Sequence, residues 1–114
     1  MLTRIVDALQ GKAPLKAKRS SQWRKVRKAA IDKHPYCAAC GGISKLEVHH
    51  IVPFNIDPSL ELDPKNLIVL CESGHGGVNC HLHYGHLGNY AHINPEVVLD
   101  ADIWLRKVME VELC

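Results

Sequence analysis

The sequence predicts one small α+β domain that a structural metal helps to hold together. Helical periodicity marks residues 20–34 and 95–112, and two short segments between them, 45–52 and 66–71, have strand character. Two cysteine pairs are interleaved with these segments. The chain has 114 residues and only 5% aromatic residues, so little material is available for a core. A bound metal would supply the missing folding free energy, because ligation and folding are coupled in small domains.

The first 19 residues are predicted to form a basic, flexible arm that precedes a domain of residues 20–114. Gly11 and Pro14 interrupt any long helix there, and a short amphipathic turn within the first ten residues is the most regular structure expected.

A helix is predicted from Ser20 or Ser21, either of which can cap its start, to His34, where Pro35 ends it. Trp23 is expected to be a core residue rather than a platform for a nucleic-acid base. The apolar positions recur at helical spacing: Trp23, Val26, Ala30 and Ile31.

The elements that follow are short. Residues 37–42 are predicted to form a tight knuckle, 45–52 a strand ending at Pro53, 54–65 a loop, 66–71 a strand, 73–77 a flexible segment and 80–87 a brief helix. The last helix, residues 95–112, is expected to bury one apolar face formed by Val97, Val98, Ile103, Trp104, Val108 and Val111.

Charge is distributed unevenly along the chain, although the formal net charge is only +2. Residues 1–50 carry eleven Lys or Arg against three acids, and residues 51–114 carry three against nine. A basic surface of this kind binds polyanions, because neutralised phosphates release counterions. A solvated helix face is the alternative interpretation. The candidate DNA-binding residues are Arg19, Arg24, Lys25, Arg27 and Lys28.

No stretch approaches the roughly 18 apolar residues of a membrane span, and the first residues lack the apolar core of a secretory signal. We therefore expect a cytoplasmic protein with no membrane partner. Reducing conditions there keep thiols free for metal rather than for disulfides.

The two cysteine pairs, Cys37-x2-Cys40 and Cys71-x8-Cys80, can supply four thiolates to one tetrahedral zinc. Such a site has no open position and would be structural. The second spacing is unusually wide, and His75 could replace one cysteine; free buried thiols are the other alternative. Cys114 is interpreted as a bystander.

Histidines gather in two groups, His49-His50 and the run that contains His81, His83 and His86. Adjacent strand residues point to opposite faces, so a distorted strand end near Pro53 is expected, with one imidazole binding metal and its neighbour addressing a water. The remaining histidines, His34, His75 and His92, are interpreted as ordinary surface or core residues.

The ordered segments Glu47-Val48-His49-His50-Ile51-Val52-Pro53, Asn66-Leu67, Leu70-Cys71 and Cys80-His81 resemble the HNH endonuclease family. The segments Val78-Asn79-Cys80-His81, Gly85-His86-Leu87-Gly88-Asn89 and Asn94-Pro95 are similar to its phage and prophage branch. The resemblance implies a ββα-metal fold, in which two strands and a helix hold one divalent cation beside a zinc staple. It also implies nicking or cleavage of double-stranded DNA.

The resemblance further implies that His50 is the general base, that Asn66 orients it, and that His49 and His81 bind the catalytic cation. The third metal ligand is left open between His86, which is favoured, and His83, since residues 81 and 86 do not share a face of an α-helix. Position 49 often holds Asp in the family, and histidine there admits Mn²⁺, Ni²⁺, Co²⁺ or Zn²⁺ as well as Mg²⁺.

A zinc-stapled DNA-binding or DNA-packaging module without catalysis is the main alternative. The resemblance also suggests a bacterial or phage-infected host and action beside a phage terminase. Monomer and homodimer remain open, as do the target sequence and the choice between nicking and double-strand cleavage.

Overall fold

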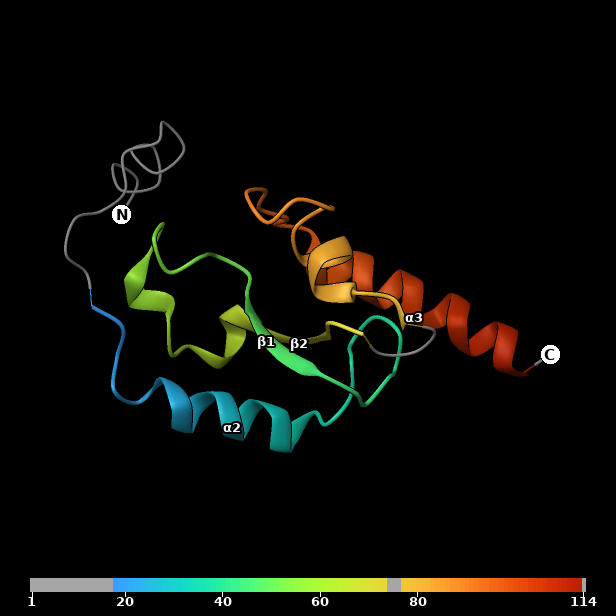
Figure 1. The fold of residues 1–114 in the computed structure, drawn as a ribbon, viewed down its shortest axis with the longest axis horizontal. Helices are drawn as coiled ribbons and strands as arrows, with labels where there is room; N and C mark the ends of the chain where they lie inside the picture. Colours follow the sequence, from blue (N-terminus) through green and yellow to red (C-terminus); the bar gives the residue numbers. More distant parts are fainter. Residues whose placement is uncertain (1–17, 74–76, 114) are drawn as a thin grey trace.

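The computed structural model describes residues 18–73 and 77–113, so predictions for residues 1–17 and 74–76 lie outside the described part. At its centre is a two-stranded antiparallel sheet with helices on both sides (Figure 1). Strand β1 spans Leu46–His50 and strand β2 spans Leu67–Cys71. The predicted small α+β class is therefore confirmed.

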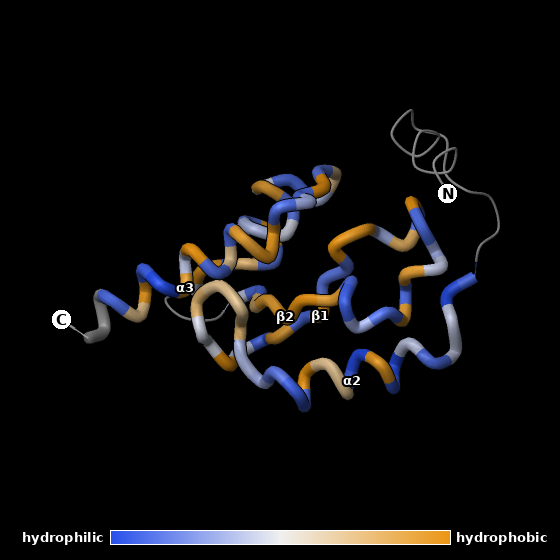
Figure 2. The backbone as a smooth tube through the Cα atoms, turned by 180° about the vertical axis from the view of Figure 1, so that it is seen from behind, coloured by the Kyte–Doolittle hydropathy of each residue, from blue (hydrophilic) through white to orange (hydrophobic). Residues whose placement is uncertain are grey.

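Helix α2, Trp23–Lys33, contacts both strands from one side. A short π-helix, η4, His81–Gly85, contacts both strands and also α3, Val97–Leu113. Figures 1 and 2 show the sheet between α2 on one side and η4 with α3 on the other. This order of layers presents one face of β1 to α2 and the opposite face to η4.

The start of α2 differs from the prediction. The capping position is Gln22, whose side chain makes no capping bond, because Ser20 closes the preceding turn instead. The Ser20 carbonyl accepts the Trp23 N–H at 3.2 Å, and its hydroxyl accepts the Gln22 N–H at 3.0 Å. Trp23 was predicted to be a core residue, which is wrong: no residue of α2 is buried, and Trp23 is half-buried against the sheet.

The segment between the strands is more ordered than the predicted loop. It contains two single turns of 3₁₀-helix, η1, Pro58–Leu60, and η2, Pro64–Asn66. An aspartate precedes each proline and caps the turn: Asp57 accepts the Ser59 N–H and Asp63 accepts the Lys65 N–H. Proline at the first position and aspartate at the cap are the local signals for such turns.

The core is small and consists half of thiols. Its buried members are Cys37, Ala39, Cys40, Leu70, Cys71, Cys80, Val97 and Ala101. No aromatic side chain of the described residues belongs to this buried group. The shortage of apolar burial supports the expectation that a metal at the cysteines stabilises the fold.

The apolar face of α3 was predicted only in part. Val97 is buried, and Leu105 and Val108 are half-buried, so the buried stripe runs through Val97, Ala101, Leu105 and Val108. Val98 and Ile103 were assigned to this face, and Trp104 as well, but all three are exposed. The side chain of Val111 lies outside the described part. Ala101 is only weakly hydrophobic, so the sequence pattern did not indicate that it belongs to the buried stripe of α3.

Among the described residues, no helix has both the length and the apolar character that a bilayer crossing requires.

Candidate metal centres and catalytic residues

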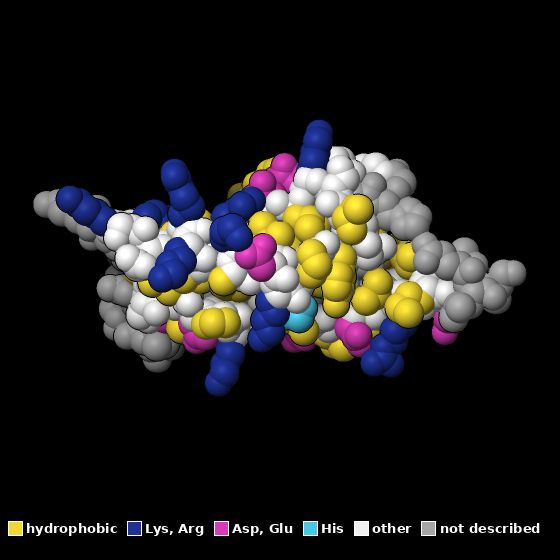
Figure 3. All heavy atoms as spheres, turned by 90° about the horizontal axis from the view of Figure 1, so that it is seen from below, with side chains coloured by type: hydrophobic (Ala, Val, Ile, Leu, Met, Phe, Trp, Pro, Cys, Tyr) yellow, Lys and Arg dark blue, Asp and Glu magenta, His cyan; other side chains and the backbone are white. Residues whose placement is uncertain are grey.

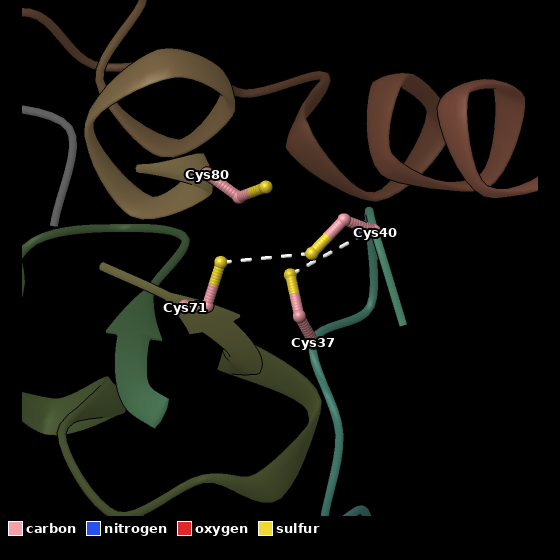
Figure 4. A group of neighbouring side chains, drawn as sticks. All are labelled: Cys37, Cys40, Cys71 and Cys80. Atoms are coloured by element: carbon pink, nitrogen blue, oxygen red, sulfur yellow. Dashed lines mark hydrogen bonds between the residues drawn. The ribbon is translucent and has the colours of Figure 1, made fainter. Parts of the chain in front are cut away.

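Four cysteines from three separate segments converge on one point. Cys37 and Cys40 come from the knuckle before β1, Cys71 ends β2, and Cys80 immediately precedes η4 (Figure 4). All four are buried, and their sulfur atoms lie within 4.8 Å of one another. The prediction that these residues can hold one metal is confirmed. The wide spacing of the second pair is tolerated because both of its members sit at the ends of ordered elements.

Backbone N–H groups of the knuckle point at its sulfurs. Ala39 and Cys40 donate to Cys37 Sγ at 3.4 and 3.5 Å, and Gly42 donates to Cys40 Sγ at 3.4 Å. A hydrogen bond with the Cys80 thiol, followed by backbone N–H groups that include those of Cys40 and Ala39, lowers the pKa of Cys37 to about 4, against the opposing effect of burial. The knuckle is thus built to hold a thiolate, the form that zinc binds.

A second cluster lies on the η4 side of the sheet. His49 of β1, His81 at the start of η4 and His86 just after it place their ligand nitrogens within 4.8 Å of one another. His49 Nδ1 and His81 Nε2 are 3.1 Å apart. Two nitrogens that bind one cation at about 2.0–2.1 Å are separated by about 3.0–3.4 Å, so this spacing fits a shared metal.

The π-helix brings His86, and not His83, close to His49 and His81. In an α-helix, residues 81 and 86 face different directions, whereas i to i+5 hydrogen bonding brings residues five apart onto one side. The rings of His81 and His86 are accordingly 4.9 Å apart. His83 is exposed and packs against Tyr84 instead.

Hydrogen bonds orient two of the three imidazoles. His86 Nδ1 is 3.0 Å from the carbonyl of His92, and His81 Nδ1 is 3.5 Å from a Glu72 carboxylate oxygen. With the proton on Nδ1, each ring presents the Nε2 lone pair, the form a metal ligand needs.

Gly85 allows the rings to approach each other. A Cβ at this position would lie 3.1 Å from His49 Cε1 and 3.3 Å from His81 Cδ2. A side chain at position 85 would therefore require the His49 and His81 rings to shift by a few tenths of an ångström.

His49 is the most deeply buried member of the cluster, at 5% exposure, and its Nε2 has no hydrogen-bond partner among the described residues. Burial, and then the neighbouring imidazoles, lower the pKa of His49 to about 3. Burial also lowers the pKa of His81, although Glu72 opposes the shift. Both rings are thus neutral near pH 7, which is the form that can bind a metal.

The low pKa of His49 predicts a pH dependence of stability in protein that retains zinc but lacks a second cation. The His49 imidazole takes up a proton near its ordinary pKa of 6.5 in the unfolded chain, whereas its pKa in the folded chain is about 3. The free energy of unfolding should therefore fall as the pH is lowered from 7 to about 5.5. Urea unfolding at a series of pH values measures how steeply the free energy of unfolding changes with pH. This dependence on pH should be weaker in His49→Gln than in the wild type, and it should be unchanged in His83→Gln. Equal slopes in all three proteins would contradict the assignment.

His50 points to the other side of β1. The ladder pairs His49 with Ile68 and His50 with Leu67 without interruption, so the expected distortion of the strand end is absent. His50 Nε2 lies 2.9 Å from the Glu61 carbonyl, which fixes the proton there and leaves Nδ1 as an acceptor. Burial lowers the pKa of His50, while the hydrogen bond to Glu61 opposes this shift.

Asn66 ties together the segment between the strands. Its Oδ1 accepts the Val52 N–H at 2.8 Å, and its Nδ2 donates to the carbonyls of Val52 and Leu60 at 3.0 and 3.2 Å. Asn66 is 6% exposed, and its own carbonyl accepts the Ile51 N–H at 2.8 Å. Because Leu60 precedes Glu61, Asn66 holds in place the carbonyl that His50 contacts.

We expect Asn66→Ala to lower the free energy of unfolding by about 2–3 kcal/mol, since it removes the side-chain partner of one N–H and two carbonyls. Chemical denaturation measures this effect. Asn89→Ala, on the exposed turn after η4, is the control and should change stability by less than about 0.5 kcal/mol. Equal free energies of unfolding in the two variants would show that the Asn66 side-chain hydrogen bonds do not contribute to stability.

The predicted DNA-binding residues have different surroundings. Arg24 and Lys25 are exposed, and no ion pair joins them to another described residue. Arg27 pairs with Glu47 at 3.1 Å, and Lys28 pairs with Asp32 at 2.7 Å. Arg19 pairs with Glu61 at 3.8 Å. Figure 3 shows Lys and Arg side chains projecting from the face seen from the α2 side.

The sequence analysis did not single out three residues that contact these sites: Glu61, Glu72 and Gly85. Glu72 directly follows a predicted zinc ligand, and Gly85 stands inside the histidine run, so both positions carried a signal. Glu61 acts through its backbone carbonyl, which no sequence pattern reveals. Of the other histidines, His34 and His92 are exposed, as expected, and His75 lies outside the described residues.

A family model described as HNH endonuclease matches residues 35–86. This segment begins just before the knuckle and ends at His86, so it contains both clusters together with His50 and Asn66. No curated protein and no solved structure matches the chain.

Proposed function

Because residues 35–86 of this chain match a family model described as HNH endonuclease, we propose that the protein is a metal-dependent endonuclease that hydrolyses phosphodiester bonds of double-stranded DNA. The observation that carries this proposal is the convergence of His49, His81 and His86 at metal-binding distances, next in sequence to His50. A purely structural zinc module needs the cysteine site alone. We take residues 20–114 as the nuclease domain.

His50 is the general base. Its Nε2–H donates to the Glu61 carbonyl, so Nδ1 is free to accept a proton from a water molecule that attacks the phosphorus. Burial keeps the ring neutral near pH 7, which is the form a base requires. Asn66 keeps the Glu61 carbonyl in place through its bond to Leu60.

His49, His81 and His86 would hold the catalytic cation, with Glu72 and the His92 carbonyl setting the orientation of two of the rings. When bound, a divalent cation at this position stabilises negative charge on the phosphate and on the leaving 3′ oxygen. Three imidazoles favour Mn²⁺, Co²⁺, Ni²⁺ or Zn²⁺, with Mg²⁺ as the harder alternative. The cysteine site takes structural Zn²⁺.

The basic face of α2 binds the DNA backbone in this proposal. Arg24 and Lys25 are exposed and available for phosphates, whereas Arg27, Lys28 and Arg19 must exchange a carboxylate partner for a phosphate. Contacts of this kind give affinity and little sequence readout, so we expect weak sequence specificity. A phage origin, a terminase partner and a cytoplasmic location stay predictions.

Nicking of supercoiled plasmid across a series of divalent cations, with and without EDTA, tests the proposal. Metal analysis of the same preparation should give one tight zinc and one weaker, exchangeable cation. A protein that binds DNA and a single zinc, and that fails to nick with every divalent cation in the series, would instead be the non-catalytic DNA-binding module.

The third ligand gives a matched pair of variants. We expect His86→Ala to weaken binding of the exchangeable cation by at least about 10- to 100-fold, the range that loss of a supporting partner already causes. His83→Ala alters an exposed histidine three residues away and should bind the cation as the wild type does. Calorimetric titration with Mn²⁺ or Co²⁺ measures both. The reverse order of effects would assign the third ligand to His83.

A further inference from the structure

The surroundings of His50 include residues that lie outside the matched segment. The indole of Trp23, the first residue of α2, lies against the His50 ring with centroids 4.5 Å apart and planes tilted by 32°. This stack is one of the contacts between α2 and β1, together with the hydrogen bond from Arg27 to the Leu46 carbonyl. A flat ring at this distance limits the rotation of the imidazole about its own bond to the chain.

Glu61 connects His50 to the residues that precede α2. Its backbone carbonyl accepts from His50 Nε2 at 2.9 Å, while its side-chain Oε1 accepts the Ser20 N–H at 2.9 Å. The other carboxylate oxygen lies 3.8 Å from Arg19. Glu61 is 3% exposed, and a buried carboxylate needs such partners. Removing the side chain would therefore take away one of the restraints on the backbone that His50 contacts, in addition to the one that Asn66 provides.

Arg19 is held from two directions. Its guanidinium lies 4.2 Å from the centroid of the Phe54 ring and also pairs with Glu61. Phe54 and Glu61 belong to the segment between the strands that Asn66 closes. The residues before α2 are thus bound to this segment by a ring contact, an ion pair and a backbone hydrogen bond.

We propose that Trp23 and Glu61 are positioning residues for His50, so that the start of α2 and the segment before it hold the imidazole in one orientation with its proton on Nε2. This inference rests on the proposed function, in which His50 is the base. Neither residue touches the reacting atoms. Three of the groups involved, Arg19, Ser20 and Trp23, precede the matched segment, so the family match alone does not include them.

Two matched pairs of variants test the proposal. Trp23→Leu keeps an apolar side chain without the flat ring, and Trp23→Phe restores a ring. Glu61→Ala loses the bond from the Ser20 N–H, and Glu61→Gln keeps an acceptor for it. Trp23→Leu and Glu61→Ala should lower kcat for nicking by about 10- to 100-fold, with KM within about twofold of the wild-type value. Trp23→Phe and Glu61→Gln should recover most of the wild-type rate.

The tautomer of His50 is the readout that a general loss of stability would not change. Long-range ¹H–¹⁵N spectra at fixed pH should show the proton on Nε2 in the wild type and a mixture of tautomers in Trp23→Leu and Glu61→Ala. Ile31→Ala, eight positions along α2, loosens the helix far from His50. It should lower Tm while leaving kcat and the tautomer unchanged.

The outcomes separate the two proposals. Wild-type kcat together with a single tautomer in Trp23→Leu and Glu61→Ala would overturn the positioning role and leave the nuclease assignment standing. The nuclease assignment itself would be overturned, before any variant is made, by a wild-type protein that binds DNA and both metals but fails to nick DNA with every divalent cation tested.

Discussion

Replacing His50 with alanine should reduce the rate of plasmid nicking by about 10²- to 10⁴-fold, the contribution that a positioned general base makes. His50 meets the geometric requirements of a base: Nε2 is committed to the Glu61 carbonyl, Nδ1 is left as an acceptor, and burial lowers the pKa of the ring. Both metals should remain bound and KM should change little, because the loss affects the transition state and not substrate binding.

A second variant excludes a packing effect. His50→Gln can still donate an amide N–H to the Glu61 carbonyl but has no basic nitrogen, so it should be as inactive as His50→Ala. His34→Ala changes an exposed histidine just after α2 and should nick at the wild-type rate. Wild-type nicking by His50→Gln would rule out His50 as the base.

Replacing Cys37 with serine should unfold the domain rather than only inactivate it. Zinc binding to small structural sites is worth about 10–16 kcal/mol, which equals or exceeds the roughly 5–15 kcal/mol that stabilises a typical domain. Four of the eight buried core residues here are the cysteines themselves, so little apolar burial remains once the metal is lost. The N–H donors at Cys37 Sγ would also lose the thiolate that they stabilise.

Far-UV circular dichroism, thermal melting and zinc analysis measure this effect. Cys37→Ser should lack zinc and a cooperative transition, whereas Cys114→Ser, which alters the one cysteine outside the quartet and outside the described residues, should behave as wild type. A Cys37→Ser protein that melts cooperatively near the wild-type Tm would contradict a structural role for the site.

The two metal centres are linked through adjacent residues. Cys71 precedes Glu72, which contacts His81, and Cys80 precedes His81 itself. Loss of zinc should therefore displace His81, a proposed ligand of the catalytic cation, together with its partner Glu72. Loss of the catalytic cation, by contrast, leaves the cysteine site and the core intact. Removing metals one after the other should accordingly abolish nicking before it abolishes folding.

Much of the fold followed from local chemistry in the sequence. The strands at 46–50 and 67–71 and the helices at 23–33 and 97–113 lie within a few residues of their predicted positions. The cysteine quartet followed from ligand type and spacing. The predicted cap of α2 and the core position of Trp23 were wrong, and the buried stripe of α3 was predicted only in part. The burial of Trp23 and of the α3 stripe depends on which surface packs against a neighbour.

The sequence by itself determined which thiols and imidazoles are present and in what order they occur along the chain. It predicted that the four thiols and the group of imidazoles serve different metals. Only the tertiary structure decided how the imidazoles are combined. The π-helix places His86 rather than His83 beside His81, and Gly85 provides the space for His49. Because the ladder is regular, His49 and His50 point to opposite faces of the sheet. The His50 ring contacts Trp23 of α2 and the Glu61 carbonyl on its face. Helix pitch and ring orientation follow from packing across the sheet, and residue spacing along the chain does not specify them.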